Sequence, residues 1–169
     1  MFKTTKQKII SMVICGIYIF LLIWLILFKF STNITDLDHI RNLNLIPFKG
    51  SLVVNGRISM DEIIYNILVF VPFGVYVNIF YNKWSIGKKI LILFSLSVLF
   101  EVVQFVFAIG ASDITDIIGN TLGGILGFFF YMLFKKLFQG KCITVINVIG
   151  LIVELLALIM LAILFAVNI

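Results

Sequence analysis

Five long stretches of apolar residues, separated by short polar segments, are the feature that most constrains this chain. A helix rises about 1.5 Å per residue, so about twenty residues cross the roughly 30 Å hydrocarbon core of a bilayer. The five stretches meet that length and cover residues 9–28, 62–81, 90–109, 116–134 and 147–167. The sequence therefore predicts an all-α membrane protein, a bundle of about five transmembrane helices in a single domain over residues 1–169.

Composition argues against the soluble classes of protein. Apolar residues make up 62% of the 169 residues and charged residues only 12%, whereas soluble domains are about 45–50% apolar. The net charge of +5 does not predict nucleic-acid binding, because the basic residues lie in small groups beside the apolar stretches. The first stretch follows three lysines, as a signal peptide would, but no small-residue cleavage site follows it, so we expect it to stay as an anchor.

The distribution of Lys and Arg predicts the orientation, since cytoplasmic loops carry the excess of positive charge. A cytoplasmic N-terminus puts nine basic residues inside and four outside. The inner ones are Lys3, Lys6, Lys8, Lys83, Lys88, Lys89, Lys135, Lys136 and Lys141, and the outer ones are Lys29, Arg41, Lys49 and Arg57. We therefore predict a multi-pass protein of the bacterial cytoplasmic membrane with its N-terminus in the cytoplasm and its C-terminus outside.

Polar side chains inside the apolar stretches are the candidates for a functional site. An ionisable group at bilayer depth costs several kcal/mol and normally faces the interior of the bundle. Counted from the outer boundary, three amides on three helices lie at a depth of about 6 to 8 Å, and a carboxylate lies about one turn deeper. Two further carboxylates stand at the start of the fourth stretch, at spacings of three and four, so they share a helix face with the amide of that stretch. The amides are Asn66, Gln104 and Asn120, the deeper carboxylate is Glu101, and the other two are Asp113 and Asp116.

Each of these residues also has a simpler structural interpretation. The three amides can be hydrogen bonds between helices, worth about 1 kcal/mol each. Asp113 can be a helix N-cap, with Asp116 favoured by the helix dipole in the first turn. Glu154 is a second buried carboxylate, about 10 Å from the inner face, and we expect it to pair with a lysine near that face. The available partners are Lys135, Lys136 and Lys141.

Proline and glycine indicate how the helices pack. Pro72 cannot donate to the carbonyl of Leu68, which leaves an acceptor near the depth of Glu101. A stripe of small residues in the fourth stretch, with Gly74 in the second, lets another helix approach closely. The stripe consists of Gly119, Gly123 and Gly127, with Gly124 beside it. We expect its partner to be the second or third helix, and homodimerisation is the competing use.

The connection between the first two stretches, residues 29–61, is longer than a tight turn requires. It contains a partly apolar run at residues 43–48. This run can rest on the membrane interface or dip back into the bundle, and an ordinary surface loop is an equal alternative.

Four blocks in a fixed order resemble the VanZ-like family of bacterial membrane proteins. They are residues 44–48 (NLIPF), 66–74 (NILVFVPFG), 101–104 (EVVQ) and 113–124 (DITDIIGNTLGG). The resemblance covers about residues 44–131. Many members carry an Arg just before the Asp-x-x-Asp segment, where this chain has Ala111 and Ser112. The family is named after an accessory factor that lowers susceptibility to the glycopeptide teicoplanin, so the resemblance implies work at the cell envelope and a link to antibiotic resistance.

Together, the polar cluster and the resemblance predict a protein that binds or remodels an outer-leaflet component, such as a lipid headgroup or a cell-wall precursor. An intramembrane enzyme, in which Glu101, Asp113 and Asp116 bind a metal or act as acid and base, ranks second because the motif residues include no nucleophile and no His. A small lipid or solute transporter ranks third, because the inner half offers only Asn78 and Glu154 as polar groups. No metal or cofactor is predicted, and membrane lipids are the expected partners.

Overall fold

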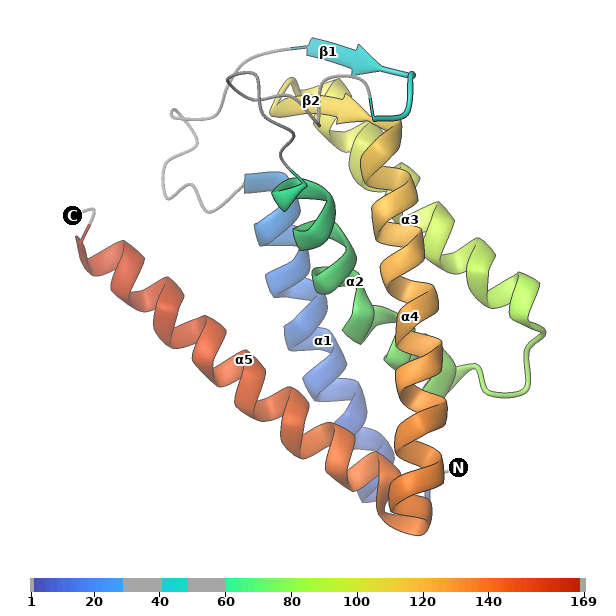
Figure 1. The fold of residues 1–169 in the computed structure, drawn as a ribbon. Coiled ribbons are helices and arrows are strands. Elements are labelled where there is room, and N and C mark those ends of the chain that lie inside the picture. Colours follow the sequence, from blue (N-terminus) through green and yellow to red (C-terminus); the bar gives the residue numbers. More distant parts are fainter. Residues whose placement is uncertain (1, 29–40, 49–59, 168–169) are drawn as a thin grey trace.

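The computed structural model describes residues 2–28, 41–48 and 60–167, which form five α-helices, a short 3-10 turn and two short strands (Figure 1). The helices are α1 (Thr5–Phe28), α2 (Asp61–Phe80), α3 (Ile86–Phe107), α4 (Ile114–Phe138) and α5 (Cys142–Val167). The strands are β1 (Arg41–Asn44) and β2 (Gly110–Asp113), and the turn η2 (Gln139–Lys141) joins α4 to α5. The apolar stretches of the sequence thus all form helices, whose ends lie a few residues from the expected ones.

Four helical segments are long and apolar enough to cross a membrane, and the last of them runs from Ile114 to Val167. Within that segment η2 reverses the chain, so α4 and α5 form the two arms of a V (Figure 1). The prediction of an all-α membrane protein is confirmed. The number of crossings and the side on which each terminus lies stay predictions.

The bundle is held together by close packing between α2 and α4. A Cβ atom added at Gly123 would overlap the backbone oxygen of Ile67, and one at Gly127 would overlap that of Val71. A Cβ at Gly124 would instead meet the side chain of Leu93 on α3. The glycine stripe therefore packs against α2 and α3 within the chain.

Aromatic rings form much of the core between α2, α3 and α4. Phe70 is fully buried, and its ring meets those of Phe73 and Phe100 edge to face, at centroid distances of 6.0 and 6.2 Å. Beside Pro72, the hydroxyl of Tyr18 donates to the carbonyl oxygen of Val69 at 2.6 Å. This bond ties α1 to the proline-containing turn of α2, where the regular helical hydrogen bonding is interrupted.

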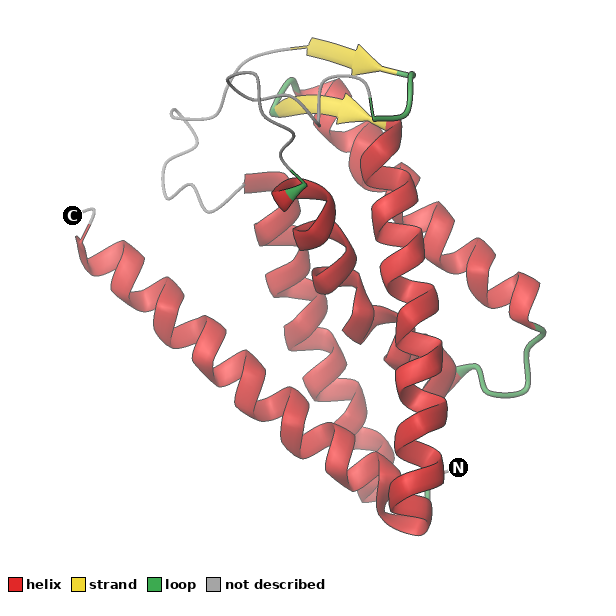
Figure 2. Cartoon of the chain, viewed as in Figure 1, coloured by secondary structure: helices red, strands yellow, loops and turns green. Residues whose placement is uncertain are grey.

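A two-stranded parallel sheet covers the end of the bundle where α3 ends and α4 begins (Figure 2). Strand β1 pairs with β2 in a register that sets Arg41 opposite Gly110 and Asn44 opposite Asp113. The chain leaves α3 through Ala108, which has a left-handed φ of 54°, and then runs straight into β2. We call this end of the bundle the sheet end, and the opposite end the η2 end.

The apolar run at residues 43–48 is fastened to this sheet. Leu43 belongs to β1, and the backbone N–H of Phe48 donates to the hydroxyl of Thr115 at 3.0 Å. The side chains of Leu45 and Ile46 are exposed. The run therefore lies across the start of α4 and presents apolar side chains outward at the sheet end.

Candidate functional site

A pocket of about 620 Å³ opens at the sheet end between α1, α2, α3 and α4. Five of the six residues proposed from the sequence line it. Two carboxylates and one phenol at the start of α2, those of Asp61, Glu62 and Tyr65, line it as well. The full lining is Leu25, Ile26, Asp61, Glu62, Tyr65, Asn66, Val69, Glu101, Gln104, Asp116 and Asn120. Residues from four helices thus meet in one pocket, while their depth in the membrane stays a prediction.

Close packing of α2 on α4 brings the first two of these residues together. The side-chain amide of Asn66 donates to Oδ1 of Asp116 at 2.7 Å. One turn further along α4, a Cβ at Gly119 would lie only 3.5 Å from Cβ of Asn66. The two helices are therefore close enough here for the amide to reach the carboxylate.

Glu101 connects α3 to the sheet. It is 6% exposed, and its Oε2 accepts from the backbone N–H of Asp113 at 2.9 Å. Its backbone oxygen also accepts from the hydroxyl of Ser112 at 2.8 Å. When the Glu101 carboxylate is ionised, its bond to the N–H of Asp113 is charge-assisted and stronger than a neutral hydrogen bond. Glu101 therefore fixes the strand that leads into α4 and borders the pocket at the same time.

Asp113 does not line the pocket, because its carboxylate serves the N-terminus of α4. Oδ1 accepts from the backbone N–H of Thr115 at 2.7 Å, which is an N-cap, and Oδ2 accepts from the side-chain amide of Asn44 at 2.9 Å. The carboxylate thus joins β1 to α4. Of the six residues proposed as ligand contacts, Asp113 is the one whose side chain the structure places in a supporting role.

The other two amides each have one group bonded and one group without a partner. Nε2 of Gln104 donates to the carbonyl oxygen of Ile26 at 3.0 Å, and Nδ2 of Asn120 donates to the hydroxyl of Ser97 at 2.9 Å. Because a carbonyl oxygen can only accept, the bond to Ile26 fixes the orientation of the Gln104 amide. Within the described part of the chain, Oε1 of Gln104 and Oδ1 of Asn120 are buried and accept no hydrogen bond.

An unsatisfied buried acceptor costs about 1–3 kcal/mol, and native structures contain few of them. Here two occur in one pocket, on residues that are 3% and 1% exposed. The described residues of the pocket wall include four carboxylates and no Lys, Arg or His. The pocket is therefore rich in acceptors and suits a ligand that carries hydrogen-bond donors.

The carboxylates do not form a metal-ligand set. In residues 2–28, 41–48 and 60–167, no three Asp, Glu, His or Cys side chains lie close enough together to hold a metal ion. The metal-enzyme hypothesis groups Glu101, Asp113 and Asp116, but the Asp113 carboxylate faces Asn44 and the backbone of Thr115.

Three residues that support the site were not singled out from the sequence. Ser97 holds Asn120, Asn44 holds Asp113, and Thr115, which is 1% exposed, holds the backbone of Phe48. Ser97 precedes Glu101 by one helical turn, so its position on the inner face of α3 could have been found from the helical period. Asn44 and Thr115 lie within the motif blocks. Their hydrogen bonds to Asp113 and Phe48 form beside the β1–β2 sheet, which the sequence did not predict.

The structure contradicts the expectation that Glu154 pairs with a lysine near the inner face. The residue is 5% exposed, and within the described ranges it has no ion pair with Lys135, Lys136 or Lys141, which are exposed at the η2 end. Glu154 follows the start of α5 by twelve residues, which amounts to about 18 Å of helix. Such a distance exceeds the reach of a lysine side chain, so the snorkelling interpretation is wrong.

Replacing Asp113 by alanine is expected to lower the free energy of unfolding by about 1–2 kcal/mol, because the change removes an N-cap and the tie to Asn44. Unfolding by sodium dodecyl sulfate in mixed micelles, followed by circular dichroism, measures the change. Serine at this position keeps an N-cap but cannot reach Asn44, so Asp113→Ser should lose less. Equal stability of the alanine variant and the native protein would contradict the supporting role.

The fold and this pocket define a helical integral membrane protein with an acceptor-rich pocket at one end of its bundle. The chain belongs to the VanZ/LLP1 family, whose model matches residues 15–135. It is similar to Protein VanZ of Enterococcus faecium, with 40% identity over 155 residues that cover 90% of this chain and 92% of that protein. No solved structure shows significant similarity. The family match includes most of α1, which the four motif blocks did not reach.

Proposed function

We propose that this protein acts at the outer face of the bacterial cell membrane, where the sheet-end pocket binds the polar headgroup of an envelope lipid or of a lipid-linked cell-wall precursor. By holding or remodelling that component, the protein contributes to resistance against glycopeptides such as teicoplanin. The observation that carries the proposal is the convergence of Asn66, Glu101, Gln104, Asp116 and Asn120 in one pocket. Similarity to Protein VanZ supports the connection to glycopeptide resistance.

The orientation is part of the proposal. The excess of Lys and Arg at one end, nine residues against four, supports a cytoplasmic η2 end and an external sheet end. The exposed apolar side chains of Leu45, Ile46 and Phe48 beside the sheet suit the boundary between headgroups and acyl chains. In this orientation a headgroup in the outer leaflet reaches the pocket without leaving the membrane surface.

Binding fits the geometry better than catalysis does. The unpartnered oxygens of Gln104 and Asn120 are acceptors that a ligand's hydroxyl, amide or ammonium donors would satisfy. The described lining contains no Ser, Thr, Cys, His or Lys, so a covalent nucleophile there would have to be a carboxylate or Tyr65. A rigid set of acceptors recognises donors by position, which is the usual basis of specificity in a polar pocket.

The proposal is tested by three single substitutions, Glu101→Gln, Asp116→Asn and Asn66→Ala, in a strain whose glycopeptide resistance depends on this protein. We expect each variant to reach the membrane at normal abundance and to lose most of the teicoplanin resistance. Glu101→Gln is the most informative change, because a glutamine oxygen can still accept from the N–H of Asp113 while the charge is removed. Teicoplanin susceptibility and immunoblots of membrane fractions are the two measurements.

Lys136→Gln is the matched control, since it also changes one charge but lies at the η2 end on an exposed side chain. It should leave resistance unchanged. Full resistance in all three pocket variants, or loss that only follows loss of the protein from the membrane, would show that the cluster stabilises the bundle and binds nothing.

A further inference from the structure

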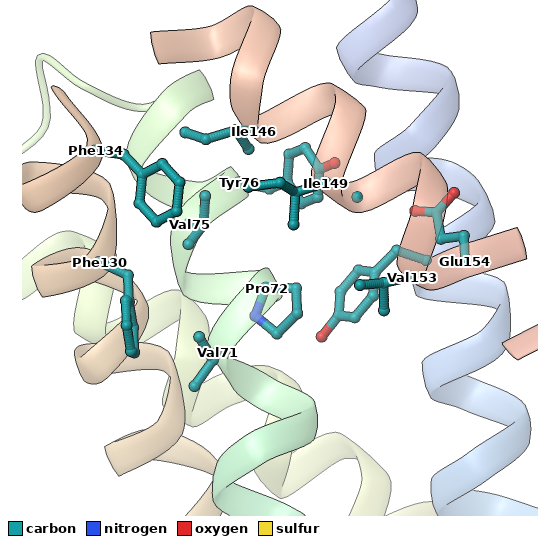
Figure 3. Close-up of a pocket in the computed structure, with 12 residues that line it drawn as sticks. Val71, Pro72, Val75, Tyr76, Phe130, Phe134, Ile146, Ile149, Val153 and Glu154 are labelled. Carbon is teal, nitrogen blue, oxygen red and sulfur yellow. The ribbon is translucent and has the colours of Figure 1, made fainter. Parts of the chain in front are cut away.

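A second cavity, of about 300 Å³, lies between α2, α4 and α5 (Figure 3). Its lining includes Phe134 and Ile146, which flank η2 in the chain, so it lies toward the η2 end. Its walls are apolar and aromatic. They include Pro72 and Val75 of α2, Phe130 and Phe134 of α4, and Ile149 and Val153 of α5. Figure 3 shows the two phenylalanine rings on the α4 side of the cavity and Glu154 on the opposite side, at α5.

Two polar groups in this apolar cavity have no hydrogen-bond partner. Oε2 of Glu154 and the hydroxyl of Tyr76 are both buried without a partner in the described part of the chain, on residues that are 5% and 3% exposed. Tyr18 also lines the cavity, but its hydroxyl is bonded to the carbonyl of Val69. An acid and a phenol thus face an otherwise apolar space with their hydrogen-bonding capacity unused.

The described residues around this acid supply no cation. None of the residues that line the cavity from α1, α2, α4 or α5 is Lys, Arg or His. The lysines at the end of α4 are exposed, and Lys89 of α3 is bonded to Asn78. A carboxyl group in such surroundings is costly unless an opposite charge or a hydrogen-bond donor meets it, so the missing partner must come from outside the described chain.

We propose that this cavity binds a lipophilic amine, a molecule with an apolar body and one protonated primary or secondary ammonium group. The ammonium pairs with the carboxylate of Glu154 and donates a second hydrogen bond to the hydroxyl oxygen of Tyr76. The apolar body lies between Pro72 and the rings of Phe130 and Phe134, and a longer tail extends from the open side of the cavity between the arms of the α4–α5 V.

Charge selects an amine over the other molecules that an apolar cavity accepts. An alcohol offers one neutral hydrogen bond, whereas an ammonium offers several donors and a charge that strengthens each of them. Aromatic side chains near the cation add a further attraction through their ring faces. An acyl chain without a donor would leave both Glu154 and Tyr76 unsatisfied. The assignment does not depend on the sheet-end pocket and can fail or succeed independently of it.

Calorimetric titration of the purified full-length protein in nonionic detergent tests the assignment with three probes of one chain length: decylamine, decanol and decyl sulfate. Titration of protein-free micelles supplies the background. The native protein should bind decylamine at least about tenfold more tightly than decanol, which corresponds to one charge-assisted hydrogen bond, and should show no binding of decyl sulfate. Equal affinity for the amine and the alcohol would overturn the proposal.

Two polar variants locate the ammonium group. Glu154→Gln should weaken decylamine binding about tenfold to a hundredfold and leave decanol unchanged, since only the charge is removed. Tyr76→Phe should weaken decylamine binding about threefold to tenfold. Undiminished decylamine binding by Glu154→Gln would show that the carboxylate does not contact the amine.

Two substitutions on α5 that change side-chain size keep the test valid if Glu154→Gln or Tyr76→Phe folds poorly. Val153 lines the cavity and Leu155 does not, yet both are about equally exposed, at 55% and 57%. Val153→Phe fills part of the cavity and should weaken both decylamine and decanol, while Leu155→Phe should change neither. Binding that is insensitive to Val153→Phe would place the amine elsewhere and refute the assignment.

Discussion

Replacing Gly123 by alanine should destabilise the bundle by about 3 kcal/mol, the upper end of the range for overpacked interiors. The added methyl group would overlap the backbone oxygen of Ile67. A backbone group in the middle of a helix cannot rotate away as a flexible side chain can, so α2 and α4 must move apart. Unfolding by sodium dodecyl sulfate in mixed micelles, followed by circular dichroism, gives the change in free energy.

Gly119→Ala is the control, because it makes the same chemical change in the same stripe of the same helix. A Cβ at Gly119 would lie 3.5 Å from its nearest neighbour, an ordinary van der Waals distance. Alanine also favours the helix over glycine by about 1 kcal/mol, so this variant should be as stable as the native protein or more so. Equal stability of the two alanine variants would mean that α2 and α4 are not in contact at Gly123.

The same substitution should also disturb the sheet-end pocket. Asn66 precedes Ile67, whose backbone lies against Gly123, and the amide of Asn66 donates to Asp116 of α4. A separation of a few tenths of an ångström at Gly123 would lengthen the hydrogen bond of 2.7 Å. We therefore expect Gly123→Ala, where it still folds, to lose resistance together with stability, unlike Glu101→Gln, which should lose resistance alone.

The helices and the level of the pocket could be predicted from the sequence for physical reasons. A bilayer requires about twenty apolar residues per helix, so hydropathy located every helix within a few residues. A fixed rise per residue then placed Asn66, Glu101, Gln104 and Asn120 at neighbouring depths, and the structure puts all four in one pocket. Depth along a helix follows from counting, and it needs no knowledge of tertiary contacts.

Contacts that depend on how helices turn toward one another could not be predicted in this way. Strand β1 has four residues without alternating polarity, and its pairing with β2 joins segments far apart in the chain. Lys89 was assigned to an inner loop, but α3 begins at Ile86, and Lys89 is 6% exposed and bonded to Asn78. Counting residues gave the depth of Glu154 but could not show that Lys135, Lys136 and Lys141 lie too far away to pair with it.

The sheet-end pocket and the cavity beside α5 therefore differ in kind. At the sheet end, most polar atoms bond to one another, and the unpartnered oxygens belong to amides that are already held by a second bond. In the cavity beside α5, the unpartnered groups are an acid and a phenol with apolar neighbours. The hydrogen bonds of the sheet-end pocket stabilise the fold and leave two amide oxygens available. The unpartnered acid and phenol of the cavity lower the stability of the fold when no ligand is bound.

Replacing Glu154 by leucine should accordingly raise the free energy of unfolding, by about 1–3 kcal/mol, the cost of burying a polar group without its hydrogen bond. Leucine is similar in size to glutamate and apolar like the walls of the cavity. In the unfolded protein the carboxyl group can reach water or another partner, so the cost falls mainly on the folded state. Sodium dodecyl sulfate titration of the ligand-free protein measures the difference.

Asn147→Leu provides a comparison of opposite sign on the same helix. Asn147 is 7% exposed, close to the 5% of Glu154, but its side chain is satisfied by Ser11, whose hydroxyl donates to Oδ1 at 3.0 Å and accepts from Nδ2 at 2.9 Å. Leucine there breaks the tie between α5 and α1 and should destabilise the protein by about 1–3 kcal/mol. If Glu154→Leu were destabilising as well, the acid would have a partner in the folded protein. A variant that gains stability and loses the preference for decylamine would show instead that the bundle tolerates an unfavourable residue because a ligand uses it.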